Sequence, residues 1–226
     1  MKFLTLIALA NASSILNDLD NGDTSIESRI EAYTCKRAGT DKKLYKDLET
    51  QYKAELARSP HDNTLSVSPF GPMTHKRSRE TLIELISTLN AAFPDYDFSY
   101  LRGEHFVKEE LFSVVSDINS RLESIPNYEE VKEKVWNAID TEIQLQDCDI
   151  YSFRPDIDSN PFEGTVWNFN YFFFNKKKLK RIVIWTCCAK WKGEEDAVLP
   201  ALPEKISVPL YPEGDFDMNE MMDYVY

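Results

Sequence analysis

The chain has 226 residues, of which 26 are Lys or Arg and 38 are Asp or Glu, so its formal net charge is −12. Hydrophobic residues make up 42% and aromatic residues 12% of the chain, a composition that excludes a wholly disordered protein. No apolar run approaches the ~20 residues of a membrane helix. The net negative charge excludes a general affinity for nucleic acid. We therefore expect a globular protein without membrane insertion and without direct, sequence-specific DNA binding.

The negative charge is concentrated near the C-terminal end. Residues 193–226 contain nine Asp and Glu against one Lys, together with four of the eleven prolines. Acidic residues and prolines without a sustained apolar period are typical of segments that stay unfolded. We predict an acidic, mostly disordered tail over 193–226 and a near-neutral globular domain over 1–192.

The first residues permit two interpretations. Residues 1–12 resemble a signal peptide, with a positive start, a short apolar stretch and an Ala-Asn-Ala sequence that resembles a cleavage site. The chain would then be a secreted binding domain whose four cysteines could form disulfides. However, the apolar spacing continues beyond this point. It equally fits a buried strand over 1–8 and a helix over 9–20 that belong to the domain itself.

The next segments alternate between strand and helix patterns. Alternating apolar and polar residues over 24–36 predict a strand with one solvated face, and 41–58 fit a charged helix. Residues 59–79 contain Pro, Gly and Ser but no apolar period, which indicates a flexible linker. Residues 81–93 predict a strong helix with one apolar face, made by Leu82, Leu85, Ile86 and Leu89.

The C-terminal half predicts two helices and then three strands. The helices cover 108–123 and 128–144, and the strands cover 148–153, 166–174 and 179–188. The last two strands flank a hairpin-like turn. Strands at both ends with helices between them predict one mixed α/β domain whose sheet joins the N-terminal and C-terminal parts. The linker is then an insertion inside this domain.

No catalytic or metal-binding set is recognisable. Of the three histidines, only His105 lies outside the expected linker, in a polar connection that favours a surface position. Cys-x-x-Cys pairs and phosphate-binding loop motifs are absent. Cys187 and Cys188 would point to opposite faces of a strand, while Cys35 and Cys148 fit reduced core positions. We therefore expect no enzyme activity, no metal and no cofactor.

Five positive charges fall within six residues around the predicted turn: Lys176, Lys177, Lys178, Lys180 and Arg181. Such a cluster is typical of a nuclear localisation signal, of a docking patch for an acidic surface, or simply of a solvated turn. A second basic cluster surrounds Ser78, where an added phosphate would cancel positive charge beside a helix. Ser78, and Ser68 before Pro69, are candidate phosphorylation sites.

Three stretches are distinctive in their order and spacing: 30–43, 93–99 and 147–182. The residues that carry the pattern are Tyr33, Cys35, Lys36, Pro94, Asp95, Tyr96, Asp97, Phe98, Trp167, Asn168, Phe169, Tyr171 and Asn175. In these stretches the chain resembles the Maf family of general negative regulators of RNA polymerase III.

The resemblance implies a single sandwich-like α/β domain without catalytic activity, with a mixed, mainly antiparallel sheet packed by helices. An N-terminal box (1–58) and two later boxes (80–192) would be separated by the flexible linker (59–79). The resemblance also implies binding to RNA polymerase III at its clamp and initiation subunits, which blocks recruitment to the promoter-bound B-type initiation factor. Kinases and phosphatases would control this activity in response to nutrients and stress. A nuclear import receptor would bind the basic turn, and the protein would shuttle between nucleus and cytoplasm.

Overall fold

The computed structural model describes residues 1–19, 21–36, 39–58, 68–156 and 160–192. The chain divides into two units, Met1–Lys192 and Gly193–Tyr226. The predicted disordered tail coincides with the second unit and lies outside the described residues.

The first unit contains strands and helices in mixed order. They are β1 (Lys2–Leu4), α1 (Ile7–Asn17), β2 (Thr24–Thr34), α2 (Gly39–Arg58), α3 (Lys76–Ala92), β3 (Phe106–Glu109), α4 (Leu111–Leu122), α5 (Tyr128–Ile143), β4 (Asp149–Phe153), β5 (Trp167–Asn175) and β6 (Arg181–Trp191). Two 3₁₀ turns, Gly103–His105 and Leu145–Asp147, precede β3 and β4.

The strands form one six-stranded sheet in the order β1-β2-β6-β5-β4-β3. The long strand β2 pairs with β6 from Thr24↔Trp191 to Thr34↔Arg181, so the sheet joins the two halves of the sequence, as predicted. Each described pairing is antiparallel, which makes the sheet more uniform than the mixed arrangement expected. The predicted α/β class is confirmed.

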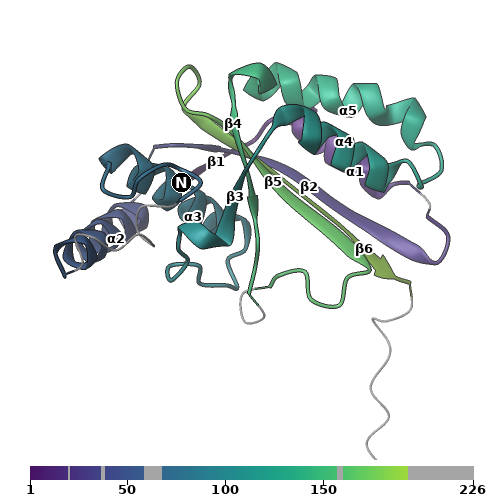
Figure 1. Ribbon diagram of the computed structural model, residues 1–226. Helices are drawn as coiled ribbons and strands as arrows, with labels where there is room; N and C mark the ends of the chain where they lie inside the picture. The colour runs from purple at the N-terminus through teal and green to yellow at the C-terminus, as the bar shows by residue number, and fades with distance from the viewer. Residues whose placement is uncertain (20, 37–38, 59–67, 157–159, 193–226) are drawn as a thin grey trace, which may run out of the picture. The chain divides into compact units, whose positions relative to one another are not determined.

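One face of the sheet is covered by α1, α4 and α5 (Figure 1). Successive residues of a strand point to opposite faces, so alternate positions of β6 enter this layer: Val183, Trp185, Cys187 and Ala189. The apolar stripes of α4 and α5 pack against them, with the buried residues Val114, Ile118, Leu122, Val135, Ile139 and Ile143. This cluster is the larger of the two hydrophobic cores.

The other face carries α2 and α3 (Figure 1). The apolar face predicted for α3 is confirmed, because each of its four members, Leu82, Leu85, Ile86 and Leu89, is 0% exposed. The intervening strand positions complete this second core, including Phe172, Phe174, Ile182 and Ile184. The aromatic strand β5 therefore supplies side chains to both cores.

The N-terminal residues are part of the domain. β1 pairs with the end of β2, and Leu9, Ala12 and Leu16 of α1 are at most 2% exposed. The predicted buried strand over 1–8 is too long, because only Lys2–Leu4 pair and α1 already begins at Ile7. A domain without residues 1–12 would lose β1 and the first half of α1. The structure therefore argues against their removal as a signal peptide.

The prediction of a flexible linker over 59–79 is wrong for its second part. Residues 59–67 lie outside the described residues, but Met73 is 3% exposed and α3 begins at Lys76. The first turn of α3 is polar and basic, and it therefore lacks the apolar period that marks the rest of the helix. Its position in the fold is determined by Arg79, which pairs with Glu49 of α2.

The edge strand β3 was not predicted. Its four residues pair with β4 in the register Phe106↔Phe153 to Glu109↔Ile150. Four residues are too few to distinguish a strand period from the start of a helix. The expected helix over 108–123 accordingly begins only at Leu111. Among the described residues, no helix has both the length and the apolar character needed to cross a membrane.

Candidate interaction surface

The described residues contain no group of three or more His, Cys, Asp or Glu side chains that could hold a metal ion. His105, predicted to lie at the surface, has a side chain that is only 11% exposed. Its Nε2 lies 2.9 Å from Oδ2 of Asp156, and its Nδ1 accepts a hydrogen bond from the backbone N–H of Arg102. His105 therefore joins the 3₁₀ turn before β3 to the loop after β4.

The basic turn between β5 and β6 is held in place by Asn175. This side chain is 0% exposed and donates a hydrogen bond of 2.9 Å to the carbonyl oxygen of Ile143, at the end of α5. Its Oδ1 accepts hydrogen bonds from the backbone N–H groups of Lys178 and Leu179, each at 3.1 Å. One buried amide thus connects the turn to α5 and sets the shape of the turn.

The five cations of the turn do not form one free patch. Lys178 pairs with Asp147 at 2.7 Å, and Arg181 pairs with Glu142 at 3.1 Å. Lys177 and Lys180 are exposed and have no acidic partner among the described residues.

Lys176 turns toward α3. Its Nζ donates to Oγ1 of Thr81 at 2.7 Å and lies 3.4 Å from the carbonyl oxygen of Arg77. Burial against α3 lowers the pKa of this ammonium group. The Nζ also lies 5.6 Å from the ring centroid of Phe174. Lys176 therefore connects the turn to the α2–α3 layer rather than extending into solvent.

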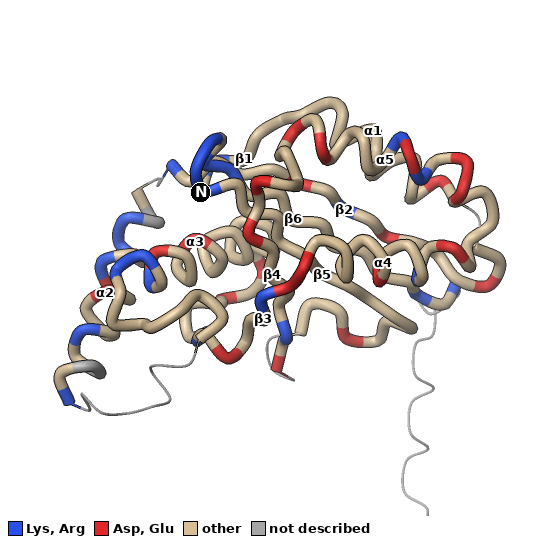
Figure 2. The backbone as a smooth tube through the Cα atoms, turned by 45° about the horizontal axis from the view of Figure 1, so that its top comes forward, with Lys and Arg blue, Asp and Glu red and all other residues tan. Residues whose placement is uncertain are grey.

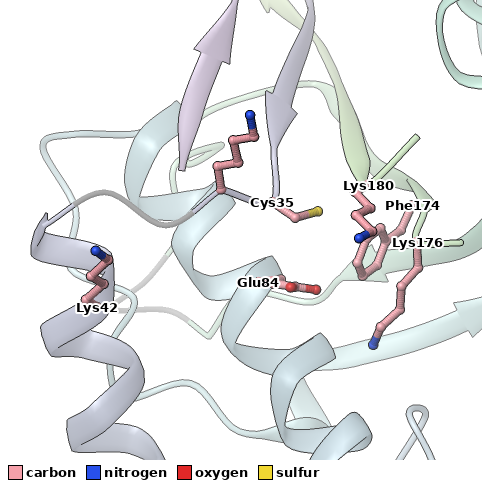
Figure 3. A pocket seen from close by; sticks show the side chains of 7 residues that line it. Cys35, Lys42, Glu84, Phe174, Lys176 and Lys180 are labelled. Carbon is pink, nitrogen blue, oxygen red and sulfur yellow. The ribbon is translucent and has the colours of Figure 1, made fainter. Parts of the chain in front are cut away.

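A cavity of about 580 Å³ opens between the turn, the end of β2, α2 and α3 (Figure 3). We call it the lysine pocket and define it by its lining residues, Cys35, Lys36, Lys42, Glu84, Phe174, Lys176 and Lys180. The lining thus combines four lysines with one acidic residue. In Figure 3 the Cys35 and Glu84 side chains extend between Lys42 on one side and Lys180 with Phe174 on the other.

The backbone at Lys180 brings two walls of this pocket together. Lys180 has φ = 49°, in the left-handed region that residues other than Gly seldom adopt. In this conformation its carbonyl oxygen accepts a hydrogen bond of 3.0 Å from the backbone N–H of Cys35. The end of β2 and the start of β6 are therefore joined directly at the pocket. Figure 2 shows further Lys and Arg positions along α2, the helix that contributes Lys42.

The residues that carried the family resemblance are distributed over the domain. Tyr33, Cys35 and Lys36 lie at the end of β2, and the latter two line the lysine pocket. The Pro94-Asp95-Tyr96-Asp97-Phe98 stretch ends α3; Phe98 is 0% exposed and packs edge-on against Phe153. In the same stretch, hydrogen bonds from Ser99 lower the pKa of Asp97.

The aromatic residues of β5 are core residues. Phe169 is 4% exposed and stacks with the partly buried Trp167, with 6.2 Å between ring centroids. Tyr171 donates a hydrogen bond of 2.8 Å to Asp117 of α4, and Asn168 donates one of 3.1 Å to Thr165. This strand therefore supports the fold, and only its end, from Phe174 onward, reaches the lysine pocket.

The two candidate phosphorylation sites lie in a folded segment. Ser78 is 4% exposed in the first turn of α3, and its hydroxyl donates to the carbonyl oxygen of Phe70 at 3.0 Å. Ser68 is partly exposed, and its hydroxyl donates to the carbonyl oxygen of Gly71 at 2.6 Å. The Ser78 hydroxyl is not accessible in this conformation.

Comparisons with known proteins agree with the resemblance seen in the sequence. The profile of the Maf1 regulator family matches residues 26–186, from β2 to β6. The chain is 35% identical to the repressor of RNA polymerase III transcription of Dictyostelium discoideum, covering 83% of this chain and 84% of that protein. It is 38% identical to the repressor of RNA polymerase III transcription maf1 of Schizosaccharomyces pombe, covering 81% and 80%.

The fold leads to the same family. A crystal structure of citrus MAF1 superposes with a TM-score of 0.65 at 31% sequence identity, covering 81% of this chain and 99% of the citrus chain. A second crystal form of the citrus protein gives a TM-score of 0.64 at the same identity. The matched profile, the sequence relatives and the shared fold together establish that this chain belongs to the Maf1 regulator family.

Proposed function

We propose that this chain represses transcription by RNA polymerase III and that it acts by binding the polymerase. The observation that carries the proposal is the similarity to two proteins, both named as repressors of this transcription, over four-fifths of the chain. Binding at the clamp and initiation subunits would prevent the polymerase from engaging the promoter-bound B-type initiation factor.

The charge distribution supports a role in binding. The exposed lysines of the turn favour an acidic partner surface, because complementary charges accelerate association and fix orientation. Most of the affinity would come from apolar contacts that become desolvated in the complex. Exposed aromatic side chains such as Phe3 and Phe112, 52% and 85% exposed, are available for such contacts.

The test is promoter-dependent transcription by purified RNA polymerase III with increasing amounts of the unphosphorylated full chain. We expect selective loss of polymerase III transcripts, while a parallel polymerase II reaction is unaffected. Initiation complexes assembled before the protein is added should resist inhibition, because recruitment has already occurred. Equal inhibition of both polymerases, or none with folded protein, would contradict the proposal.

We also propose control by kinases and phosphatases, with Ser68 as the more accessible of the two candidate serines. Phosphorylation of Ser78 requires the first turn of α3 to open, because its hydroxyl is buried against Phe70. Phosphopeptide mapping from growing and starved cells tests this. Modification of Ser78 without modification of Ser68 would contradict the order of accessibility.

Nuclear import through the basic turn is a further part of the proposal. Lys177 and Lys180 extend from the turn without an acidic partner among the described residues, so an import receptor could bind them without breaking an ion pair. Replacing both with Ala should reduce the nuclear fraction of a tagged protein, while Lys190→Ala at the far end of β6 serves as the control. An unchanged nuclear fraction in the double variant would count against import through this turn.

A further inference from the structure

We propose that the lysine pocket is a binding site for a compact ligand that carries several phosphate groups. Lys36, Lys42 and Lys180 would bind the phosphates, and Phe174 would form the apolar floor. This inference does not depend on how the protein meets the polymerase.

The lysines of the pocket come from separate segments of the chain. Lys36 follows β2 and Lys42 lies six residues later in the first turns of α2, whereas Lys180 precedes β6, so two segments that are distant in the sequence contribute lysines to one cavity. All three side chains are exposed, and none has an acidic partner among the described residues. Lysines that repel one another in this way favour an anion between them, and the ammonium group is a common ligand of phosphate.

The lining of the pocket contains one acid, Glu84. Glu84 reduces the positive charge of the pocket and attracts the ammonium group of Lys176, which also donates a hydrogen bond to Thr81. Glu84 and Lys176 therefore offset one another beside α3. The other three lysines retain their charge for a ligand.

The backbone of Lys180 adopts a conformation that is unusual for lysine. A residue with φ = 49° is under strain unless it is Gly, and Asn tolerates this region better than Lys. If position 180 only had to form the turn, Gly or Asn would adopt this backbone conformation at a lower free-energy cost than Lys. Residues other than Gly that are held in such strained regions are concentrated at functional sites. The ammonium group that Lys180 contributes to the pocket is a reason for a lysine at this position.

The lysine pocket is large enough for a small molecule. A cavity of about 580 Å³ lies within the range of ~300–1,000 Å³ of small-molecule sites. A single inorganic phosphate would fill a small part of this volume and reach few of the lysines. A molecule with two or more phosphates would fill more of the cavity, on opposite sides of which Lys42 and Lys180 lie in Figure 3.

The experiment is isothermal titration calorimetry on the full chain with tripolyphosphate and inositol hexakisphosphate as probes, at constant ionic strength. Inorganic phosphate and hexaglutamate are titrated in parallel. We expect saturable 1:1 binding of at least one polyphosphate probe, at least tenfold tighter than inorganic phosphate or hexaglutamate. No saturable binding of either probe at millimolar concentration would overturn the proposal. Tighter binding of hexaglutamate would identify the pocket as a docking site for acidic peptides and would also overturn it.

Matched variants test whether the polyphosphate binds in the lysine pocket. Lys36→Gln and Lys180→Asn remove a pocket charge each, and Asn is compatible with the left-handed backbone. Lys177→Gln removes a charge from the same turn but not from the pocket lining. We expect each pocket variant to weaken polyphosphate binding about tenfold and Lys177→Gln less than twofold, with thermal unfolding verifying that all three variants are folded. Equal losses in all three would show non-specific attraction to the basic turn and would refute the site.

Discussion

The ion pair between Arg79 and Glu49 holds α2 against α3, and its removal gives a direct test of this arrangement. Arg79 Nε and Nη2 donate to the two carboxylate oxygens of Glu49 at 2.9 and 2.8 Å. Arg79 Nη1 donates to the carbonyl oxygens of Met73 and Thr74, at 2.8 Å each. The two charged side chains are 7% and 12% exposed. The substitution Glu49→Gln removes the negative charge while keeping the size of the side chain.

The expected loss follows from this geometry. Removing one partner of a buried ion pair destabilises a protein by about 3–5 kcal/mol. Here the arginine keeps its two carbonyl acceptors and the pair lies near the surface, so we expect Glu49→Gln to lower the free energy of unfolding by about 2–3 kcal/mol. For a domain of this size, that corresponds to a decrease in melting temperature of about 5–10 °C.

The same pair predicts a pH dependence. Hydrogen bonds from Arg79 are the main reason that the pKa of Glu49 lies below its ordinary value of 4.5. A carboxyl group whose pKa is lower in the folded state contributes its stabilisation above the unfolded-state pKa. That contribution is lost as the pH falls through the folded-state value. Wild-type protein should therefore lose stability below about pH 4.5, and this part of the loss should be missing in Glu49→Gln.

Urea unfolding followed by circular dichroism measures both effects. Lys53→Gln is the matched control, because Lys53 approaches the same carboxylate at 3.5 Å but its side chain is 66% exposed. We expect the control to change the free energy of unfolding by less than about 0.5 kcal/mol. Equal effects of the two substitutions, or a loss below about 1 kcal/mol in Glu49→Gln, would refute the assignment of Glu49–Arg79 as the connection between α2 and α3.

Three further predictions concern the core, the sheet edge and the thiols. Phe173→Ala should lower the free energy of unfolding in urea by about 3–5 kcal/mol, because this ring is 0% exposed. A loss under about 2 kcal/mol would mean that the larger hydrophobic core, beneath α1, α4 and α5, is loosely packed. Asn17→Ala should accelerate hydrogen exchange at the amide of Ser28, because Asn17 Oδ1 accepts from this N–H and its Nδ2 donates to the carbonyl oxygen of the same residue; unchanged exchange would contradict that contact. Burial raises the pKa of Cys148 to about 12 and that of Cys188 to about 11, and it also raises the pKa of Cys187. Native protein at pH 8 should therefore react slowly with iodoacetamide at these three cysteines and rapidly in urea, a result that disulfides would prevent.

Much of the fold could be predicted because its apolar periods are long. The helical stripe through Leu82 and Leu89, the alternation along β2 and the apolar run of β6 are visible without any knowledge of their partners. The prediction failed where an element is short or where a partner lies far away in the sequence. Arg79 was interpreted as part of a basic linker because its partner, Glu49, lies thirty residues earlier. The edge strand β3 is too short for its period to be recognised.

The candidate site shows the same limit more clearly. The sequence presents Lys176 to Arg181 as one positive cluster, but the fold gives Lys178 and Arg181 acidic partners from the segment around α5. The fold then adds Lys36 and Lys42, which no local pattern connects with the turn. The local sequence therefore overestimates the number of free positive charges at the turn and does not indicate the pocket. The reason is that the free charge at a surface depends on the acidic residues that the fold brings close.

The lysine pocket and the Glu49–Arg79 pair meet in α2. This helix packs against α3, and it contributes Lys42 near its start and Glu49 two turns later. Ser78 precedes Arg79 in the first turn of α3, so opening that turn to expose the Ser78 hydroxyl would disturb the guanidinium that holds α2. The position of Lys42 relative to Lys36 and Lys180 would then change, because the latter two are fixed by the sheet through the Cys35–Lys180 hydrogen bond. A covalent change at the start of α3 would thus reach the pocket in two ways, through α2 to Lys42 and directly through Lys176, whose ammonium group contacts Arg77 and Thr81.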